Sequence, residues 1–358
     1  MDVKLQVIHA GEWKVLDYSS YVGNVVISDN INALGAHLKF SMGESMYTLG
    51  VTPGEIPVGS KIVLSEGETI LFRGIIVTKN VDMPGKLDYE AYDYGFYLNK
   101  SMISIQFNNV SASTAIERVC SKQGVKIHKI CDIPTKIRKI YHANLVIDVI
   151  RDILGQAEMD LGTKYRIEMH EGDSLVIEKY DNLVVELTGD YFRNSAGFTF
   201  DPAAAAIESR YTESMENLKT SVTVVSGSEK HLVRRREVKA KIPIDVTNGT
   251  GGSNYEDLYG RLNEVIRADG KNNSQINNIA QKRIKEVGRF TRSLRVKLFG
   301  DSRVRSARIL NLNPDGKIKG ALTGTFLVKS CSHNYNNNES HTMDLELEYY
   351  TKEESENA

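Results

Sequence analysis

The alternating segment near the C-terminal end of the sequence constrains the fold most strongly. Between Thr342 and Tyr350, apolar and acidic side chains alternate: Met343, Asp344, Leu345, Glu346, Leu347, Glu348 and Tyr349. A period of two places the apolar set on one face of a strand and the carboxylates on the other. Such a strand belongs to an antiparallel sheet with one buried and one solvated face. Residues 324–332 are its expected partner, joined to it through the turn-rich segment 334–340.

The first hundred residues also indicate strands. The segments 61–65 and 69–78 are joined by Glu66-Gly67-Glu68, which predicts a hairpin. A second turn at residues 82–85 returns the chain into the Tyr-rich segment 86–95. Short strands separated by frequent turns favour a barrel or a sandwich.

The pattern becomes helical at Ser111, which is expected to cap a helix that stops before Gly124. A second helix carries one apolar stripe, made of Val146, Val149, Ile150, Ile153 and Leu154. Two strands at residues 164–169 and 174–179 follow. Residues 106–182 are therefore predicted to form a small α/β module.

Strands are expected again from residue 183, beginning with 218–225. Two helical patterns interrupt them: the first comprises Leu258, Leu262, Val265 and Ile266, and the second comprises Ile276, Ile279, Ala280, Ile284 and Val287. The predicted fold class is α+β, mainly β. It consists of two tube-like antiparallel β-barrel or sandwich domains (1–105 and 183–358), with the α/β module inserted between them and a helical insertion near 254–290 in the second.

A weak internal repeat relates residues 61–95 to residues 308–350. Each segment has a short strand, a turn, a strand with a glycine near its start (Gly74 or Gly324), a second turn and a Tyr-rich strand. Sequence identity between them is negligible, so the pattern predicts related β domains without establishing a duplication.

Composition excludes several classes of protein. The chain has 358 residues, a net charge of −1 and three cysteines. This balance gives no argument for specific nucleic-acid binding, and three cysteines do not form a disulfide framework. No apolar run is long enough for stable membrane insertion or for a signal peptide. Synthesis and folding in a reducing cytoplasm are expected.

Catalytic and metal-binding motifs are not evident, and no catalytic, cofactor-binding or metal-binding residue is assigned. Cys331, His333 and His341 are residue types that zinc accepts, but an ordinary hairpin is favoured because only three ligands are visible. A Cys–His nucleophile from His128 and Cys131 lacks an orienting third group.

Two groups of charged residues are each expected to be solvated rather than functional. Glu168, Glu171 and Asp173 flank a glycine turn, where solvated acids are more usual than a glycosidase pair. The basic run Arg234–Arg236 is interpreted as a solvated strand edge or loop rim rather than a phosphate site. An acidic partner surface for this run is left open.

Several stretches together resemble phage tail hub proteins, namely the late-control-D and PBSX-type hub families of contractile tails and phage-tail-like bacteriocins. The closing hairpin carries the resemblance most clearly, with Gly324–His333 and His341–Leu347 matching "G-x-F-x-V … S-H" and "H-T-M-x-L-x-L". Residues Ile70–Val77, Tyr141–Leu161 and Arg210–Val222 are similar to the same family, in the same order. The segment 242–292 is less diagnostic.

The resemblance implies a structural role in a virion tail or tailocin baseplate, with no enzymatic activity and no cofactor. Hub proteins of this kind form a homotrimer whose two tube-like domains per chain make a pseudo-sixfold ring. The ring joins a hexameric tail tube protein to a trimeric central spike protein and contacts other baseplate proteins. The alternatives are a tail-associated cell-wall hydrolase and a carbohydrate-binding or protein-binding β module.

Overall fold

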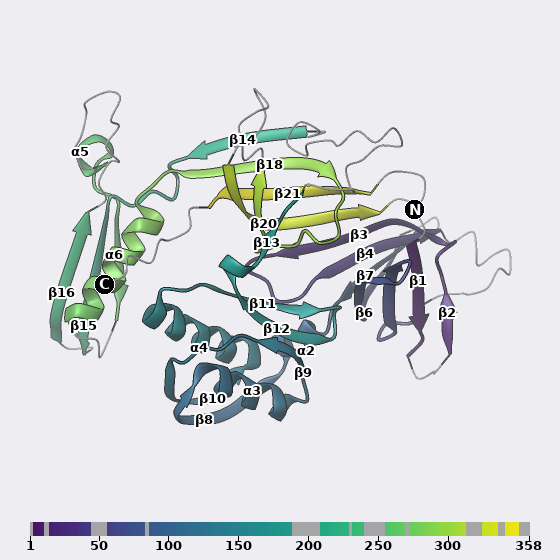
Figure 1. Ribbon diagram of the computed structural model, residues 1–358, viewed down its shortest axis with the longest axis horizontal. Helices are drawn as coiled ribbons and strands as arrows, with labels where there is room; N and C mark the ends of the chain where they lie inside the picture. Colours follow the sequence, from purple (N-terminus) through teal and green to yellow (C-terminus); the bar gives the residue numbers. More distant parts are fainter. Residues whose placement is uncertain are drawn as a thin grey trace. The chain divides into compact units, whose positions relative to one another are not determined.

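The computed structural model describes residues 3–10, 14–43, 56–82, 86–187, 208–228, 231–239, 255–268, 273–312, 324–335 and 341–350. The fold is α+β and mainly β, as expected from the sequence (Figure 1). Contacts divide the chain into two compact units, one of residues 1–210 with 294–358 and one of residues 211–293.

One long sheet dominates the structure. Its strands follow the order β14 (Glu208–Ser214), β18 (Thr291–Phe299), β21 (Thr342–Tyr349), β20 (Gly324–Tyr335), β3 (Val22–Asn30), β4 (His37–Gly43), β7 (Lys86–Tyr92), β6 (Thr69–Asp82), β5 (Lys61–Glu66), β1 (Val3–Ile8) and β2 (Val15–Asp17). Two further strands extend it beside β20, β19 (Ile309–Leu312) and β13 (Val184–Val185). The described strands leave this sheet open, with β14 and β2 at its ends, so a barrel closed within one chain is not observed.

The hairpins predicted from the sequence are confirmed. The strands β20 and β21 pair antiparallel, and β21 alternates buried and accessible residues along its length. The strands β5 and β6 pair antiparallel through the turn at Glu66–Thr69, and β6 pairs with β7. The turn at 82–85 and most of the loop 334–340 lie outside the described residues.

The internal repeat is confirmed in the strand order. In the first repeat (β3, β4, β5, β6 and β7) the spatial order is β3-β4-β7-β6-β5. In the second repeat (β14, β18, β19, β20 and β21) it is β14-β18-β21-β20-β19, which is the same sequence of first, second, fifth, fourth and third strand. Each repeat has its own apolar core, which contains Phe40, Phe72 and Tyr89 in the first and Val296, Phe326 and Leu345 in the second.

The pairing register of β6 with β7 also matches that of β20 with β21, residue by residue. Ile76 of β6 pairs with Ala91, and Val328 of β20 pairs with Leu347. The next residue in each strand, Val77 or Lys329, lies where the pairing register shifts. Such a shift marks an extra residue that bends one strand, as in a β-bulge. Identical placement of an irregularity is much stronger support for duplication than a similar pattern of polar and apolar residues.

The α/β module lies between the repeats in sequence. Its elements are α2 (Gly95–Lys100), β8 (Met102–Ser111), α3 (Ala112–Gln123), β9 (Lys126–Ile130), β10 (Lys136–Leu145), α4 (Val146–Leu161), β11 (Tyr165–His170), β12 (Ser174–Lys179) and the 3₁₀ turn η1 (Tyr180–Asn182). Ser111 accepts a hydrogen bond from the Thr114 amide, and Gly124 ends α3 in the left-handed conformation. The predicted stripe of α4 is fully buried apart from Leu154, which is 6% exposed.

The unit of residues 211–293 contains a small sheet in the order β16 (His231–Lys239), β15 (Ser221–Ser228), β17 (Asn263–Arg267), with α5 (Tyr255–Tyr259) and α6 (Asn273–Val287). The second helical pattern is confirmed as α6, which packs Ile276, Ala280 and Ile284 against the sheet. The first helical pattern wrongly predicted a helix at Val265 and Ile266. These residues form β17, which pairs parallel to β15. The β-branched side chains suit a strand, and a short apolar run cannot distinguish the two periods.

The domain boundaries at 105/106 and 182/183 stay a prediction. The division into compact units falls elsewhere: it sets residues 211–293 apart and leaves the α/β module in one unit with the rest of the chain. Within the described residues, no helix has the length and apolarity needed to cross a bilayer.

Candidate functional site: the junction between the two repeats

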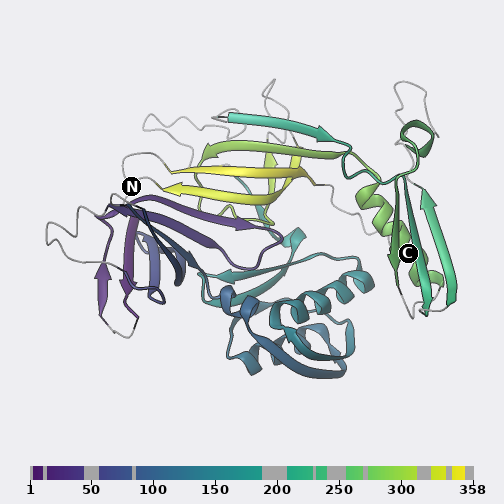
Figure 2. The same cartoon turned by 180° about the vertical axis from the view of Figure 1, so that it is seen from behind.

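Strand β20 joins the two repeats because one of its edges has two partners. Residues Gly324–Leu327 pair with β19 of the same repeat, and Ser330–Tyr335 pair with β3 of the other repeat. The change of partner falls at Lys329, whose carbonyl accepts a hydrogen bond from the Ile31 amide at 2.9 Å. In both views β20, in yellow, runs beside β3, in purple (Figures 1 and 2). The repeats therefore form one continuous sheet.

A buried ion cluster fixes the α/β module to this junction. Arg166 of β11 donates to Asp29 of β3 at 2.9 Å and to the Ser306 hydroxyl of the second repeat at 2.6 Å. It also donates to the Ile31 carbonyl at 3.0 Å. One guanidinium thus contacts both repeats, and its planar fork of donors suits several oxygen acceptors at once.

A second ion pair lies beside the first. Arg308 makes two hydrogen bonds to the Glu168 carboxylate, at 2.8 and 3.0 Å. Arg305 lies 3.6 Å from Asp29 and donates to the Met169 carbonyl at 3.1 Å. The loop before β19 therefore contacts both β3 and β11.

Charge balance keeps both carboxylates of the cluster ionised. Burial alone would raise the pKa of Asp29, but Arg166 and Arg305 outweigh burial and hold that pKa below its usual value. Burial would likewise raise the pKa of Glu168, but Arg305 and Arg308 outweigh burial and lower it. Removing one partner from such a buried group leaves an uncompensated charge, so the cluster fixes the relative placement of three segments.

Asp93 is a different kind of buried acid. It follows β7, is 1% exposed, and accepts hydrogen bonds from the amides of Ala36 and Gly95 at 2.7 and 2.9 Å. Burial raises the pKa of this carboxyl to about 7, against the opposing effect of the two amides and of Arg305. Its charge therefore changes near neutral pH.

The structure brings together the side chains weighed as a zinc site. His341 Nε2 lies 2.9 Å from His333 Nδ1, and Cys331 Sγ lies 3.1 Å from His333 Nε2. His333 Nε2 also lies 2.7 Å from the Val304 carbonyl, which can only accept, so this nitrogen carries the proton. His333 Nδ1 then accepts from His341. Within the described ranges, no group of three or more His, Cys, Asp or Glu side chains, these three included, has an arrangement that could hold a metal ion.

The acids considered for catalysis lie apart in separate ion pairs. Glu168 belongs to the junction described above, whereas Asp173 contacts Arg73 of β6 at 2.8 Å and Lys126 at 3.2 Å. Glu171, at the turn, lies 3.8 Å from His170. Their contacts are those of structural ion pairs.

The turn that carries Asp173 also packs against the first repeat. The Gly172 carbonyl accepts a hydrogen bond from the Tyr94 amide at 2.9 Å. A Cβ at Gly172 would lie 2.1 Å from the Arg73 carbonyl oxygen, so only glycine allows this approach.

The remaining candidates have ordinary surroundings. The His128 ring stacks on His170, with centroids 3.9 Å apart, and burial raises the pKa of the Cys131 thiol. The basic run falls in β16, at one edge of the small sheet, so it is a strand edge and not a loop rim. Arg235 there pairs with Glu237 at 3.0 Å.

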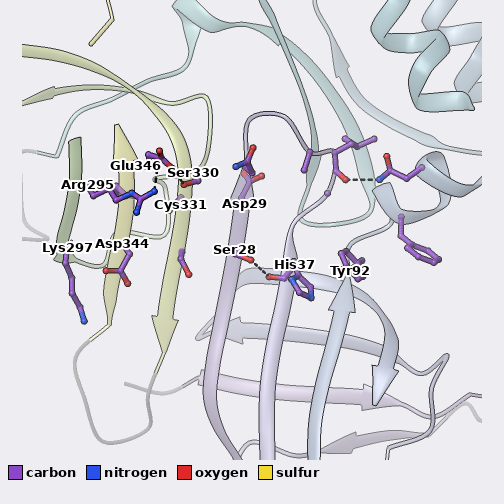
Figure 3. A pocket seen from close by; sticks show the side chains of 18 of the residues that line it. Ser28, Asp29, His37, Tyr92, Arg295, Lys297, Ser330, Cys331, Asp344 and Glu346 are labelled. Atoms are coloured by element: carbon purple, nitrogen blue, oxygen red, sulfur yellow. Dashed lines mark hydrogen bonds and ion pairs between the residues drawn. The ribbon is translucent and has the colours of Figure 1, made fainter. Parts of the chain in front are cut away.

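A hollow of about 1190 Å³ lies on one face of the continuous sheet. Figure 3 shows its labelled side chains, contributed by β18, β20 and β21 on one side and by β3, β4 and β7 on the other. Charges of both signs line it, including Arg295, Lys297, Asp344 and Glu346. Its walls therefore carry charges of both signs and span the junction.

Sequence reasoning missed most of the junction cluster. Asp29, Arg166, Arg305 and Arg308 were not singled out, and Glu168 was considered only as a catalytic acid. One signal was present: Arg166 and Glu168 alternate with Ile167 and Met169 along one strand. Burial of the polar set on such a strand requires partners from elsewhere in the chain.

The chain belongs to the YQBQ-like family, whose model matches residues 22–348. A comparison with curated protein sequences found no match.

Solved phage tail proteins share the fold over nearly the whole chain. One is the 43 kDa tail protein of prophage MuSo2 from Shewanella oneidensis, with 12% identity, a TM-score of 0.65, and coverage of 97% of this chain and 98% of that one. Another is the tail protein from Neisseria meningitidis MC58, with 13% identity, a TM-score of 0.64 and coverage of 97% of both chains. The resemblance to phage tail proteins inferred from the sequence is confirmed at the level of fold.

A larger protein contains the same fold. A chain of the Francisella PdpA-VgrG complex matches with 9% identity and a TM-score of 0.54, covering 98% of this chain and 52% of that one. The shared region therefore makes up about half of the larger chain.

Proposed function

We propose that this chain is a structural hub, or baseplate, protein of a phage tail or phage-tail-like contractile injection particle. In this role it forms a homotrimeric ring between the hexameric tail tube and the trimeric central spike. The chain contributes surfaces for assembly and carries out no catalysis.

The duplicated sheet is the observation that carries the proposal. The two repeats share strand order, pairing register and the position of one register shift, and they lie side by side in one sheet. Three such chains present six similar repeats, which is the number needed to match a hexameric tube. Closed rings of this kind satisfy every subunit interface.

The threefold symmetry that a trimeric spike requires comes from the parts of the chain that occur only once. The α/β module of residues 95–182 and the unit of residues 211–293 occur once per chain, so three copies of each are present in a trimer. A trimeric spike meets three equivalent surfaces of this kind. The proposed partners are the tail tube protein, the central spike protein and other baseplate proteins.

Similarity to tail proteins and to a chain of a PdpA-VgrG complex supports this assignment by fold. Synthesis in the bacterial cytoplasm followed by assembly into a virion tail or tailocin baseplate fits the proposal.

The direct test has two parts. The purified full-length chain is expected to be trimeric by light scattering at micromolar concentration, and an antibody label is expected at the lower end of the tube in images of purified particles. A chain that stays monomeric in solution and is absent from the tube end would contradict the proposal. Clearing of cell walls in a zymogram, or saturable binding to isolated cell walls, would favour the hydrolase or binding-module alternatives.

A further inference from the structure

The strands β8 and β10 form a two-stranded sheet of their own in the α/β module, here called the β8–β10 ribbon. Its inner face packs into the core of the module through side chains that are at most 5% exposed: Ile103, Phe107, Ile137 and Tyr141. Side chains alternate between the two faces, so the outer face carries exposed Met102, Ser104, Gln106, Asn108, Arg138 and Ile140. Figures 1 and 2 show the ribbon on the side of the module away from β3 and β20. The outer face of the ribbon is therefore open to solvent.

The charge of this outer face has one sign. Neither strand contains an acidic residue, and their basic residues are Lys136, Arg138 and Lys139. Lys139 lies towards the module and pairs with Asp152 of α4 at 2.9 Å. Lys136 and Arg138 are exposed, and neither forms an ion pair within the described part of the chain. Lys122 of α3 adds a further positive charge where it donates to a backbone carbonyl of β8 at 2.8 Å.

Apolar side chains stand among these charges. Ile140 is 67% exposed, which is the largest exposed fraction of any large apolar side chain in the described residues, and Met102 is 63% exposed. Ile140 pairs with Gln106, and the next outward residue of β10, Arg138, pairs with Asn108. An exposed isoleucine gains free energy when a partner covers it, and the surrounding charges and amides can bond to the rim of that partner.

The shape of the ribbon is fixed by two register shifts, each of which contains a left-handed residue other than glycine. These residues are Asn109, with a φ of +59°, and Ala143, with a φ of +50°. Ser104 Oγ accepts a hydrogen bond from the Ala143 amide at 3.0 Å. Asn144 Oδ1 accepts one from the His142 amide at 3.0 Å. Extra residues of this kind bend and twist a strand, and a surface whose shape is already fixed loses less conformational entropy when a partner docks on it.

We infer that the outer face of the β8–β10 ribbon docks an acidic surface of another protein. Carboxylates of this partner pair with Lys136 and Arg138, and an apolar recess between them covers Ile140. The inference goes beyond the proposed hub role, because a single chain carries the whole surface and no contact between copies is needed.

The apolar side chains favour a protein partner over a nucleic acid. Phosphates would pair with Lys136 and Arg138 but would leave Ile140 and Met102 against a charged backbone. The net charge of −1 also gives the whole chain no general attraction for a polyanion. A protein surface with carboxylates around an apolar centre complements both sets of side chains.

Three fluorescent probes test the chemistry of the partner, with the purified full-length chain as the receptor. One peptide alternates glutamate with leucine, a second peptide of equal length and charge alternates glutamate with serine, and the third probe is a short DNA duplex. Fluorescence anisotropy is expected to show saturable binding of the glutamate-leucine peptide. Its dissociation constant is expected to be lower than those of the other two probes by about tenfold or more, because only this peptide offers both carboxylates and apolar surface.

Two matched pairs of substitutions locate the binding surface. Ile140→Asp and Arg138→Glu are each expected to raise the dissociation constant of the glutamate-leucine peptide by about tenfold, since each places a negative charge where the peptide docks. The controls are Val15→Asp, at an exposed valine of β2, and Lys61→Glu, at an exposed lysine of β5. Each control is expected to change the dissociation constant less than about twofold. All four variants alter exposed side chains and should keep the wild-type circular dichroism spectrum.

Several outcomes would overturn the inference while leaving the hub role to its own test. Absence of peptide binding, or equal losses in the ribbon variants and their controls, would show that the ribbon is not the docking surface. Tighter binding of the DNA duplex than of either peptide would assign the surface to nucleic acid instead. A change in oligomeric state by light scattering in Ile140→Asp, and not in Val15→Asp, would assign it to contacts between copies of this chain.

Discussion

Ala307 holds in the second repeat the left-handed backbone conformation that Gly59 holds in the first. Their φ angles are +63° and +88°, and each amide donates to the strand residue just before the register shift, Val328 or Ile76. The carbonyls of those residues accept at 2.8 Å in both repeats. The turn into the repeat's third strand is thus the same structure, built with glycine once and with alanine once.

The first prediction follows from this pair. Gly59→Ala is expected to lower the free energy of unfolding by about 1 kcal/mol, because a Cβ disfavours the left-handed region. The nearest heavy atom to the new Cβ, on Ala10, is 3.7 Å away, so no steric clash adds to the effect. Chemical denaturation of the two proteins measures the difference.

The same substitution in a helix supplies the control. Gly155→Ala in α4 meets nothing within 4 Å and is expected to raise stability by about 0.5–1 kcal/mol. Opposite signs for the two variants support the conformational argument, and a loss of stability in both would contradict it.

The fold was predictable wherever its signals are local. The cap at Ser111, the end of α3 at Gly124 and the alternation along β21 are each specified by neighbouring residues, and the structure reproduces them. The helix expected over Val265 and Ile266 failed because pairing with β15, distant in sequence, decides the conformation of a short apolar run.

The junction was not predictable for a related reason. Arg166 and Asp29 are 137 positions apart, and Arg308 and Glu168 are 140 apart. Nothing in the sequence between them sets these partners, because the pairing depends on how β20 aligns with β3. The duplication was visible only as a pattern until the registers of the two repeats could be compared.

The second prediction concerns the junction cluster. Arg166→Met removes the hydrogen bonds to Asp29 and Ser306 and leaves the Asp29 carboxylate buried without this partner. Breaking one side of a buried ion pair typically costs about 3–5 kcal/mol, and a loss in this range is expected in denaturant unfolding. The control is Lys86→Met, which removes an exposed pair with Asp88 and should cost less than about 1 kcal/mol. Equal effects of the two variants would show that the cluster does not hold the repeats together.

The third prediction concerns Asp93, whose pKa in the folded protein is raised from 3.8 to about 7. An acid with a raised folded pKa favours the folded state at low pH, and this contribution is lost as pH rises from about 4 through 7. The loss has a limiting slope of about 1.4 kcal/mol per pH unit. Wild-type stability minus Asp93→Asn stability is therefore expected to fall over this window. A difference that stays constant with pH would exclude Asp93 as the titrating group.

The fourth prediction has the opposite sign and concerns His341. Burial, together with neighbouring His333, lowers the pKa of His341 from 6.5 to about 4. A histidine with a depressed folded pKa stabilises the fold fully above its unfolded pKa, and the contribution is lost as pH falls from 6.5 towards 4. Wild-type stability minus His341→Gln stability should therefore decrease on acidification, whereas the difference for Asp93→Asn increases. Glutamine keeps a donor for His333 Nδ1, so the readout is the pH dependence of unfolding measured at fixed ionic strength. A flat difference between pH 6.5 and pH 4.5 would show that His341 is already accessible to protons in the folded chain.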